Sequence, residues 1–173
     1  MSSYAEEITR ASMQAMCYEL DSAVEKLDHC AAQLSDAQIW WRPTSEMNSI
    51  GNLILHLCGN LRQWVTSGIG GLTDDRNRPL EFSERGPIPM NELRQKLESE
   101  VASAKAAMMH ATPETLLKSL TIQGFAVTGY DAVVHSISHF RGHVQEIVHM
   151  TRLQLGDAYR FDFVPATPEE GAP

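Results

Sequence analysis

The sequence predicts an all-α protein, a bundle of four long helices with short connecting helices and a long loop after the second. Three observations favour this fold: apolar residues recur at helical spacing in four segments, capping signals open these segments, and glycine or proline ends them. At 173 residues the chain has the size of one domain. We expect one domain over residues 1–164 and a mobile tail over residues 165–173, which are rich in Pro, Glu and Ala.

The first helix is expected over residues 4–34, after a capping box formed by Ser3 and Glu6. A second cap pattern at Ser35 predicts a short helical turn that ends before Pro43. The expected apolar positions of the first helix are Ile8, Ala11, Ala15, Tyr18, Val24, Leu27, Ala31 and Leu34.

The second helix begins at Asn48 or Ser49, ends at the glycines from Gly68 onward and carries His56 in its middle. Residues 73–87 combine charge with turn residues and show no helical period, so we expect a long surface loop. Long loops within compact domains are often functional.

The third helix is expected from Pro89 to about His110. Residues 113–128 predict one short helical turn and then a segment, Leu120–Val127, that is either extended or a loop. Thr128 and Asp131 cap a last helix that ends at Gly156. Its expected apolar positions are Val133, Val134, Ile137, Phe140, Val144, Ile147, Val148 and Leu153.

Composition excludes several classes of function. A formal charge of -8 disfavours binding to nucleic acid or to an anionic membrane surface. The chain shows no secretion signal and no apolar run of about 20 residues that could span a bilayer. The three cysteines, Cys17, Cys30 and Cys58, form no CxxC pair, which favours a reducing, cytoplasmic location. Cys58 points roughly 200° away from His56 around the helix, so we interpret it as a small buried hydrophobe.

Histidines carry the strongest chemical signal. His135, His139 and His143 are spaced four residues apart, which stacks them on one face of the last helix with Cβ atoms about 5 to 6 Å apart. Adjacent pairs can share a metal ion, as the two histidines of HExxH do, although the glutamate of that motif is missing. Alternatively they are solvated, or are core residues with hydrogen-bonded neighbours. His56 lies on an apolar stripe, where an unpaired imidazole would be costly.

These segments resemble the DinB/YfiT-like superfamily across nearly the whole chain. The resemblance is carried by residues 48–64, NSIGNLILHLCGNLRQW, and by residues 138–147, SHFRGHVQEI. Residues 75–82, DRNRPLEF, followed by Ile88 and Pro89, resemble a branch of uncharacterised bacterial DinB-like proteins.

The resemblance implies a four-helix bundle, often a homodimer, in which His56, His139 and His143 hold a divalent transition metal, with nickel or zinc favoured. Gln145 and Glu146 stand where Gly and Gln are usual in the superfamily. The resemblance also implies a small-molecule substrate, with a low-molecular-weight thiol as one candidate, because characterised members of the superfamily include thiol-dependent transferases and isomerases.

Three imidazoles leave the usual tetrahedral shell of zinc one position short, which is typical of catalytic sites. Such an ion activates water for hydrolysis or stabilises a thiolate for transfer. His135 is left out of the ligand set, because an ion near the other two histidines of its helix is hard for it to reach. Weaker candidates for orienting a substrate are Asn60, Arg62, Arg141 and Glu146.

Two hypotheses follow. In the first, the chain is a metal-dependent enzyme that acts on a small molecule by thiol-linked transfer or hydrolysis. In the second, it is a non-catalytic bundle whose metal site is structural or vestigial and whose surface serves dimerisation or partner binding. The pattern assigns the three histidines to the metal alone and assigns no residue to catalysis or to substrate binding.

Overall fold

The computed structural model describes residues 3–163, so the tail expected at residues 165–173 lies outside the described residues. Within this range the chain forms seven α-helices, one π-helical segment, a short 3₁₀ turn and one two-stranded sheet. None of the described helices is both long enough and apolar enough to cross a membrane.

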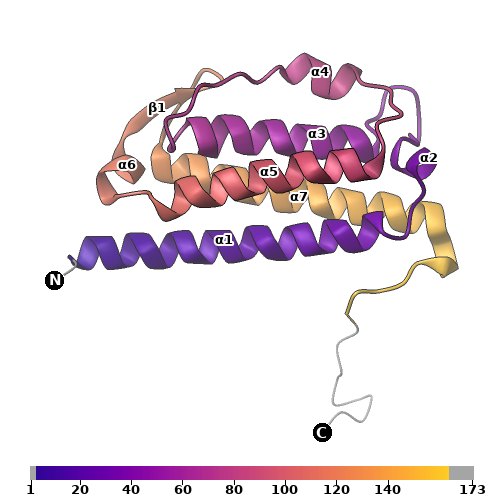
Figure 1. Ribbon diagram of the computed structural model, residues 1–173, viewed down its shortest axis with the longest axis horizontal. Helices are drawn as coiled ribbons and strands as arrows, with labels where there is room; N and C mark the ends of the chain where they lie inside the picture. The colour runs from indigo at the N-terminus through magenta and orange to yellow at the C-terminus, as the bar shows by residue number, and fades with distance from the viewer. Residues whose placement is uncertain (1–2, 164–173) are drawn as a thin grey trace, which may run out of the picture.

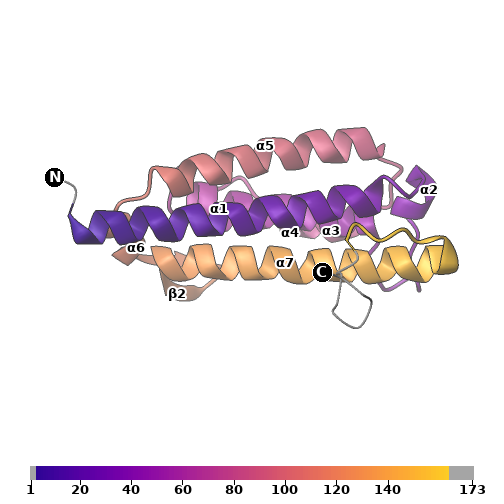
Figure 2. The same cartoon turned by 90° about the horizontal axis from the view of Figure 1, so that it is seen from below.

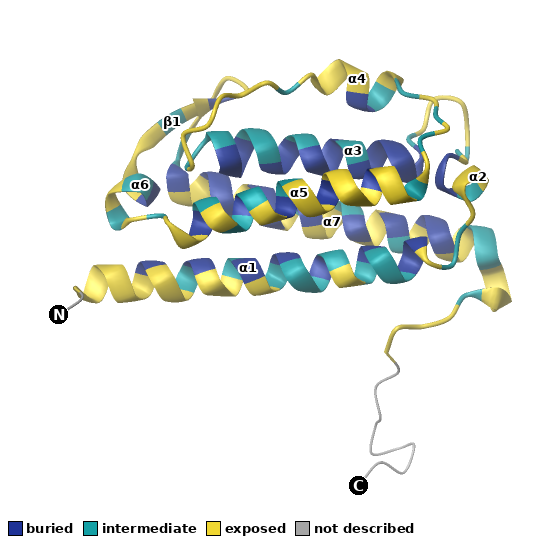
Figure 3. Cartoon of the chain, in the orientation of Figure 1, coloured by how far each residue is buried: buried dark blue, intermediate teal, exposed yellow. Residues whose placement is uncertain are grey.

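Four long helical segments lie side by side (Figures 1 and 2). They are α1 (Tyr4–Ala31), α3 (Ile50–Asn60) continued by the π-helical η1 (Leu61–Ser67), α5 (Met90–Met109) and α7 (Gly129–Leu155). Helix α1 packs on α5 and α7, and α3 packs on the same two helices. Their buried faces point toward one another and form a single apolar core (Figure 3).

Capping explains where the helices begin. Ser3, Ser35, Ser49 and Thr128 each accept a hydrogen bond from the backbone N–H three residues on, and the side chain at that position bonds back to the cap residue. The capping boxes at Ser3, Ser35 and Thr128 were predicted from the sequence, and the structure adds one at Ser49. The short connecting helices α2 (Asp36–Ile39) and α6 (Pro113–Leu117) are also present.

The predicted apolar face of the first helix is wrong in its first half. Ile8 and Tyr18 are 50% and 71% exposed, whereas Met13 and Leu20 are buried. Apolar residues occur on more than one face of this helix, so spacing alone could not decide which face packs against α5 and α7. The same applies to Leu153 near the end of α7, which is 58% exposed.

The expected surface loop contains a short helix that the sequence pattern did not reveal. Helix α4 (Arg78–Ser83) lies alongside α3 (Figure 1); Glu81 is buried, Phe82 is half-buried and its other residues are exposed. Asn52 of α3 donates from Nδ2 to the carbonyl oxygens of Glu81, at 2.8 Å, and Glu84, at 3.0 Å. Arg42 also donates to the carbonyl oxygen of Glu84. Side chains buried under the loop therefore fix its backbone.

Residues 119–128 form the one segment whose structure the sequence left open. They make an antiparallel hairpin of β1 (Ser119–Ile122) and β2 (Phe125–Thr128). The two turn residues, Gln123 and Gly124, have φ values of 53° and 83°. Positive φ at both positions is the requirement of a type I′ turn, whose twist matches that of the strands. The hairpin leads directly into α7.

The orientation of α7 can be tested by truncating one residue on each side of it. Phe140 is 1% exposed, so Phe140→Ala should lower the free energy of unfolding by about 3 to 5 kcal/mol through lost burial and the cavity that remains. Leu153→Ala should change it by less than about 0.5 kcal/mol. Urea unfolding monitored by circular dichroism measures the free energy of unfolding of both variants. Equal losses for the two variants would contradict the packing described here.

Candidate metal centre

The three histidines that the sequence singled out come together between α3 and α7. Each of His56, His139 and His143 offers a ring nitrogen, and these nitrogens all lie within 4.8 Å of one another. The Nε2 atoms of His56 and His139 are 3.1 Å apart. Within residues 3–163, no other group of three or more His, Cys, Asp or Glu side chains converges in this way.

Helix geometry explains the grouping. His139 and His143 are one turn apart on α7, with ring centroids separated by 4.5 Å. His56 is 5% exposed and faces them from the buried side of α3. His135, one turn earlier on α7, packs its ring against that of Trp64, with the ring centroids 4.1 Å apart, and is not part of the group.

A buried ion pair holds His56 from the other side. Glu81 of α4 places Oε2 2.9 Å from Nδ1 of His56. Arg76 donates from Nε to Oε1 of Glu81 at 2.7 Å and from Nη2 to Oε2 at 2.8 Å. The side chains of Arg76 and Glu81 are only 1% and 9% exposed. Burial alone would raise the pKa of Glu81, but the hydrogen bonds from Arg76 and His56 and the positive charge of Arg76 outweigh it and hold that pKa below its ordinary value.

Gly59 makes room for this ion pair. A Cβ atom at position 59 would lie 2.0 Å from Oε1 of Glu81 and 2.8 Å from Nε of Arg76. Such contacts are far inside van der Waals distance, and the carboxylate is held by two donors from Arg76. The absence of a side chain at Gly59 therefore lets Glu81 approach α3 closely enough to reach His56.

His143 has a similar but exposed partner. Its Nδ1 lies 2.8 Å from Oε2 of Glu146, one turn further along α7, and the Glu146 side chain is 42% exposed. This contact places Glu146 beside the three histidines.

His139 lies between the other two imidazoles. Burial, followed by the proximity of His143, His56 and His135, lowers the pKa of His139 to about 3. The ring is therefore neutral near pH 7, which is the form that binds metals. Its Nδ1 atom is buried and has no hydrogen-bond partner.

These residues fit a divalent metal ion. Tetrahedral ligation with bonds of 2.0 to 2.1 Å puts two ligand nitrogens about 3.3 Å apart, close to the 3.1 Å between Nε2 of His56 and Nε2 of His139. In metal sites, the second nitrogen of a histidine ligand usually bonds to a carboxylate, a carbonyl or water. His56 and His143 both have a carboxylate there.

Comparison with known proteins identifies the family. A family described as "Protein of unknown function (DUF1572)" has a model that matches residues 7–167. The chain belongs to the DUF1572 family. Among solved structures, the DUF1572 chain is similar to a conserved protein from Enterococcus faecalis, with a TM-score of 0.70 and 20% identity over 83% of this chain and 96% of that one. At this identity the likeness shows the fold alone. No curated protein sequence matches the chain.

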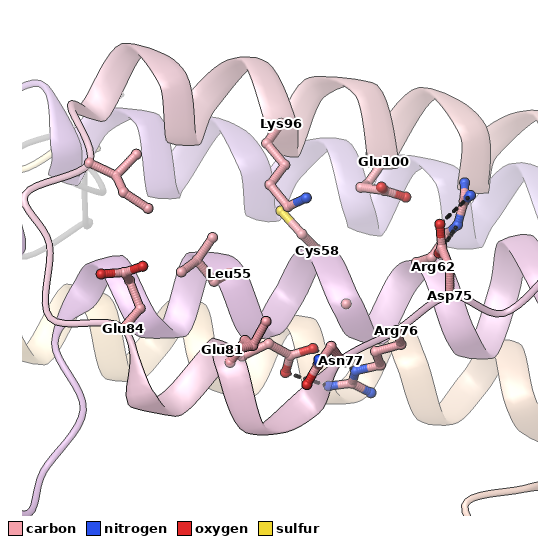
Figure 4. Close-up of a pocket in the computed structure, with 13 residues that line it drawn as sticks. Leu55, Cys58, Arg62, Asp75, Arg76, Asn77, Glu81, Glu84, Lys96 and Glu100 are labelled. Atoms are coloured by element: carbon pink, nitrogen blue, oxygen red, sulfur yellow. Dashed lines mark hydrogen bonds and ion pairs between the residues drawn. The ribbon is translucent and has the colours of Figure 1, made fainter.

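A cavity of about 410 Å³ lies on the far side of the Glu81 and Arg76 pair, between α3, α4 and α5 (Figure 4). The three histidines do not line it. Cys58 forms part of its lining but is 1% exposed, and burial raises the pKa of its thiol to about 12. The interpretation of Cys58 as a small buried hydrophobe is therefore confirmed for this DUF1572 protein.

Three of the four weaker candidates have structural partners away from the histidine group, whereas Glu146 contacts His143. Asn60 accepts a hydrogen bond from Ser136 at 2.7 Å, which links α3 to α7. Arg62 pairs with Asp75, and Arg141 pairs with Glu19. Sequence reasoning missed Glu81 and Arg76 altogether. Two signals pointed toward them: the motif DRNRPLEF at residues 75–82, which contains both, and Gly59, a residue with no side chain in the second long helix.

Stability measurements can test the buried ion pair. Arg76→Ala should lower the free energy of unfolding of the metal-free protein by about 3 to 5 kcal/mol, because it leaves the Glu81 carboxylate buried without its cation. Arg62→Ala, which breaks a pair whose Asp75 side chain is 67% exposed, should cost much less. Denaturant titration compares the two. A small and equal loss for both would show that Glu81 is not held as a buried charge.

Proposed function

We propose that this DUF1572 protein is a metal-dependent enzyme that acts on a small molecule, with a nickel or zinc ion held by His56, His139 and His143. One observation carries the proposal: three imidazole nitrogens converge, and within residues 3–163 no fourth His, Cys, Asp or Glu joins them. Catalytic zinc sites have three protein ligands and an open position, whereas structural sites are closed by four.

We also propose that the fold is the four-helix bundle of the DinB/YfiT-like superfamily. The support is positional: one histidine comes from the second long helix and an HxxxH pair comes from the last, as the superfamily pattern has them. The packing of α3 against α7 is what brings the two sources together. A homodimer and a low-molecular-weight thiol as co-substrate are part of this proposal.

When bound, the ion would act as a Lewis acid that activates water for hydrolysis or a thiol for transfer. The chain supplies the surroundings. Phe82 of α4 packs against the His56 ring at a centroid distance of 4.8 Å, and the guanidinium of Arg78 lies 4.9 Å from the centre of the Phe82 ring. Helix α4 thus contributes an apolar ring and a positive charge beside the centre, where a small anionic or polar substrate can be oriented.

The non-catalytic hypothesis, a bundle with a structural ion, calls for a closed coordination shell. The carboxylate of Glu81 lies at Nδ1 of His56, on the side of the ring opposite the Nε2 atom that faces His139, and it also accepts two hydrogen bonds from Arg76. Glu81 is therefore not available as a fourth ligand, which favours the enzyme over the structural site.

Metal analysis tests the proposal. Protein purified without chelators and analysed by inductively coupled plasma mass spectrometry should carry about one transition-metal ion per chain, the stoichiometry of a single three-histidine site. His139→Ala should lose this ion, and His135→Ala, one turn away, should keep it. Wild-type protein that takes up neither nickel nor zinc, even after reconstitution, would contradict the proposal. So would metal uptake by His139→Ala at the wild-type level.

Activity then separates the two hypotheses. The metal-loaded protein should hydrolyse activated esters or amides, or transfer a small thiol to an electrophile, and the His139→Ala variant should not. A metal-loaded wild-type protein that does neither, and whose ion has four protein ligands by X-ray absorption spectroscopy, would support the structural site instead.

A further inference from the structure

We propose that Glu81 is a positioning residue of the metal centre, which fixes the His56 ring with its proton on Nδ1 and its free electron pair on Nε2. The part of this inference that concerns metal affinity rests on the proposed function. The part that concerns the state of the His56 ring does not, because it can be measured in the metal-free protein.

The first step concerns the proton on Nδ1 of His56. Two groups lie near this atom: Oε2 of Glu81 at 2.9 Å and Nη2 of Arg76 at 3.1 Å. An ionised carboxylate only accepts hydrogen bonds, and a guanidinium only donates them. Without a proton, Nδ1 could accept from Nη2 of Arg76, but it would then lie 2.9 Å from a carboxylate oxygen with no proton between the two atoms, which is repulsive. With the proton on Nδ1, the ring donates to Glu81, and Arg76 keeps its own two bonds to the same carboxylate.

The second step follows on the other side of the ring. With its single ring proton on Nδ1, His56 has a bare Nε2, which lies 3.1 Å from Nε2 of His139. In the metal-free protein, His139 then donates from its own Nε2, so its Nδ1 is an acceptor. That Nδ1 atom is the one that is buried with no partner. A buried acceptor without a partner is less rare than a buried donor without one, so the two assignments agree.

The third step concerns the hydrogen bonds that hold Glu81 in place. Its backbone carbonyl accepts from Asn52, and its carboxylate accepts twice from Arg76. Arg76 in turn donates from Nη1 to Oε1 of Gln63 at 3.0 Å. Asn52 and Gln63, together with the space over Gly59, therefore orient Glu81 from three successive places along α3 and η1.

The exposed pair of His143 and Glu146 shows the contrast. It has the same carboxylate-to-Nδ1 contact, but Glu146 is 42% exposed and this contact is its one ion pair in the described part of the chain. Water competes for such a pair and side-chain entropy opposes it. We therefore assign the positioning role to Glu81 and not to Glu146. Loss of a carboxylate that orients a histidine ligand typically lowers metal affinity by about 10 to 100-fold.

A substitution that removes no charge tests the inference. Gly59→Ala adds a Cβ atom that would lie 2.0 Å from Oε1 of Glu81, so the carboxylate must move away from its place. Alanine is a better helix former than glycine, which favours retention of the fold. The matched control is Gly142→Ala on α7, beside His143, where the added Cβ meets no atom within 4 Å.

Competition of Zn²⁺ with a chromophoric chelator measures the affinities. Gly59→Ala should bind Zn²⁺ about 10 to 100-fold more weakly than wild type, and Gly142→Ala should match wild type. Wild-type affinity in a folded Gly59→Ala variant would overturn the inference.

Nitrogen-15 NMR of labelled histidines in the metal-free protein reports which ring nitrogen of His56 carries the proton. A purely structural role of Glu81 would not affect this position. In the wild type, the His56 signals should show a proton on Nδ1 and a bare Nε2. Glu81→Gln should reduce this preference, while Asp75→Asn, an equal change of charge at an exposed place on the same segment, should not. A proton on Nε2 of His56 in the wild type would overturn the inference.

The two proposals fail in different ways. If the wild type binds neither Zn²⁺ nor Ni²⁺, the proposed function fails, and the NMR measurement still decides whether Glu81 fixes the His56 ring. If the wild type binds metal but Gly59→Ala binds it equally well, the function stands and the role of Glu81 is wrong.

Discussion

A buried imidazole needs a partner on each of its two nitrogens, since an unpaired polar group inside a protein costs free energy. His56, on the inner face of α3, meets this requirement with Glu81 on one side and His139 on the other. The first partner requires that the segment after the second long helix fold back over α3, and the second requires that α3 and α7 pack closely. His56, together with Asn52, therefore joins the segment carrying α4 to the bundle.

In the proposed metal centre, the charges around His56 leave the fourth coordination position open. Arg76 neutralises Glu81 and binds both of its oxygens, so the carboxylate orients a histidine but is not free to bind an ion. A carboxylate ligand at this place would close the shell and reduce the charge that the ion presents to a substrate. The same compensation explains how an acidic chain can bury a carboxylate beside three histidines without bringing a net negative charge into the core.

Much of the fold could be predicted from local sequence, because capping boxes such as those of Ser49 and Thr128 act over three residues. Features that depend on contacts between residues far apart in the sequence could not be predicted in this way. The buried face of α1 is chosen by α5 and α7, and Ile8 and Tyr18 were misassigned for that reason. Helix α4 is only six residues long, too short for helical periodicity to be recognised.

The candidate centre was predictable to a similar degree. The HxxxH spacing of His139 and His143 is a property of one helix, whereas the place of His56 depended on resemblance to a known superfamily. Glu81 was not found, because its contact with His56 spans 25 residues along the chain and joins two elements of different kinds. A glycine in a buried helical segment, such as Gly59, is a general sign that another group approaches there.

Crystals grown with nickel or zinc and measured at the absorption edge of the metal test the central claim most directly. The account predicts one anomalous peak between α3 and α7, with bonds of about 2.0 to 2.1 Å to Nε2 of His56 and to nitrogens of His139 and His143. Glu81 should remain hydrogen-bonded to Nδ1 of His56 and should not coordinate the ion. An absent peak, or a peak bound by Glu81 in place of His56, would contradict the account.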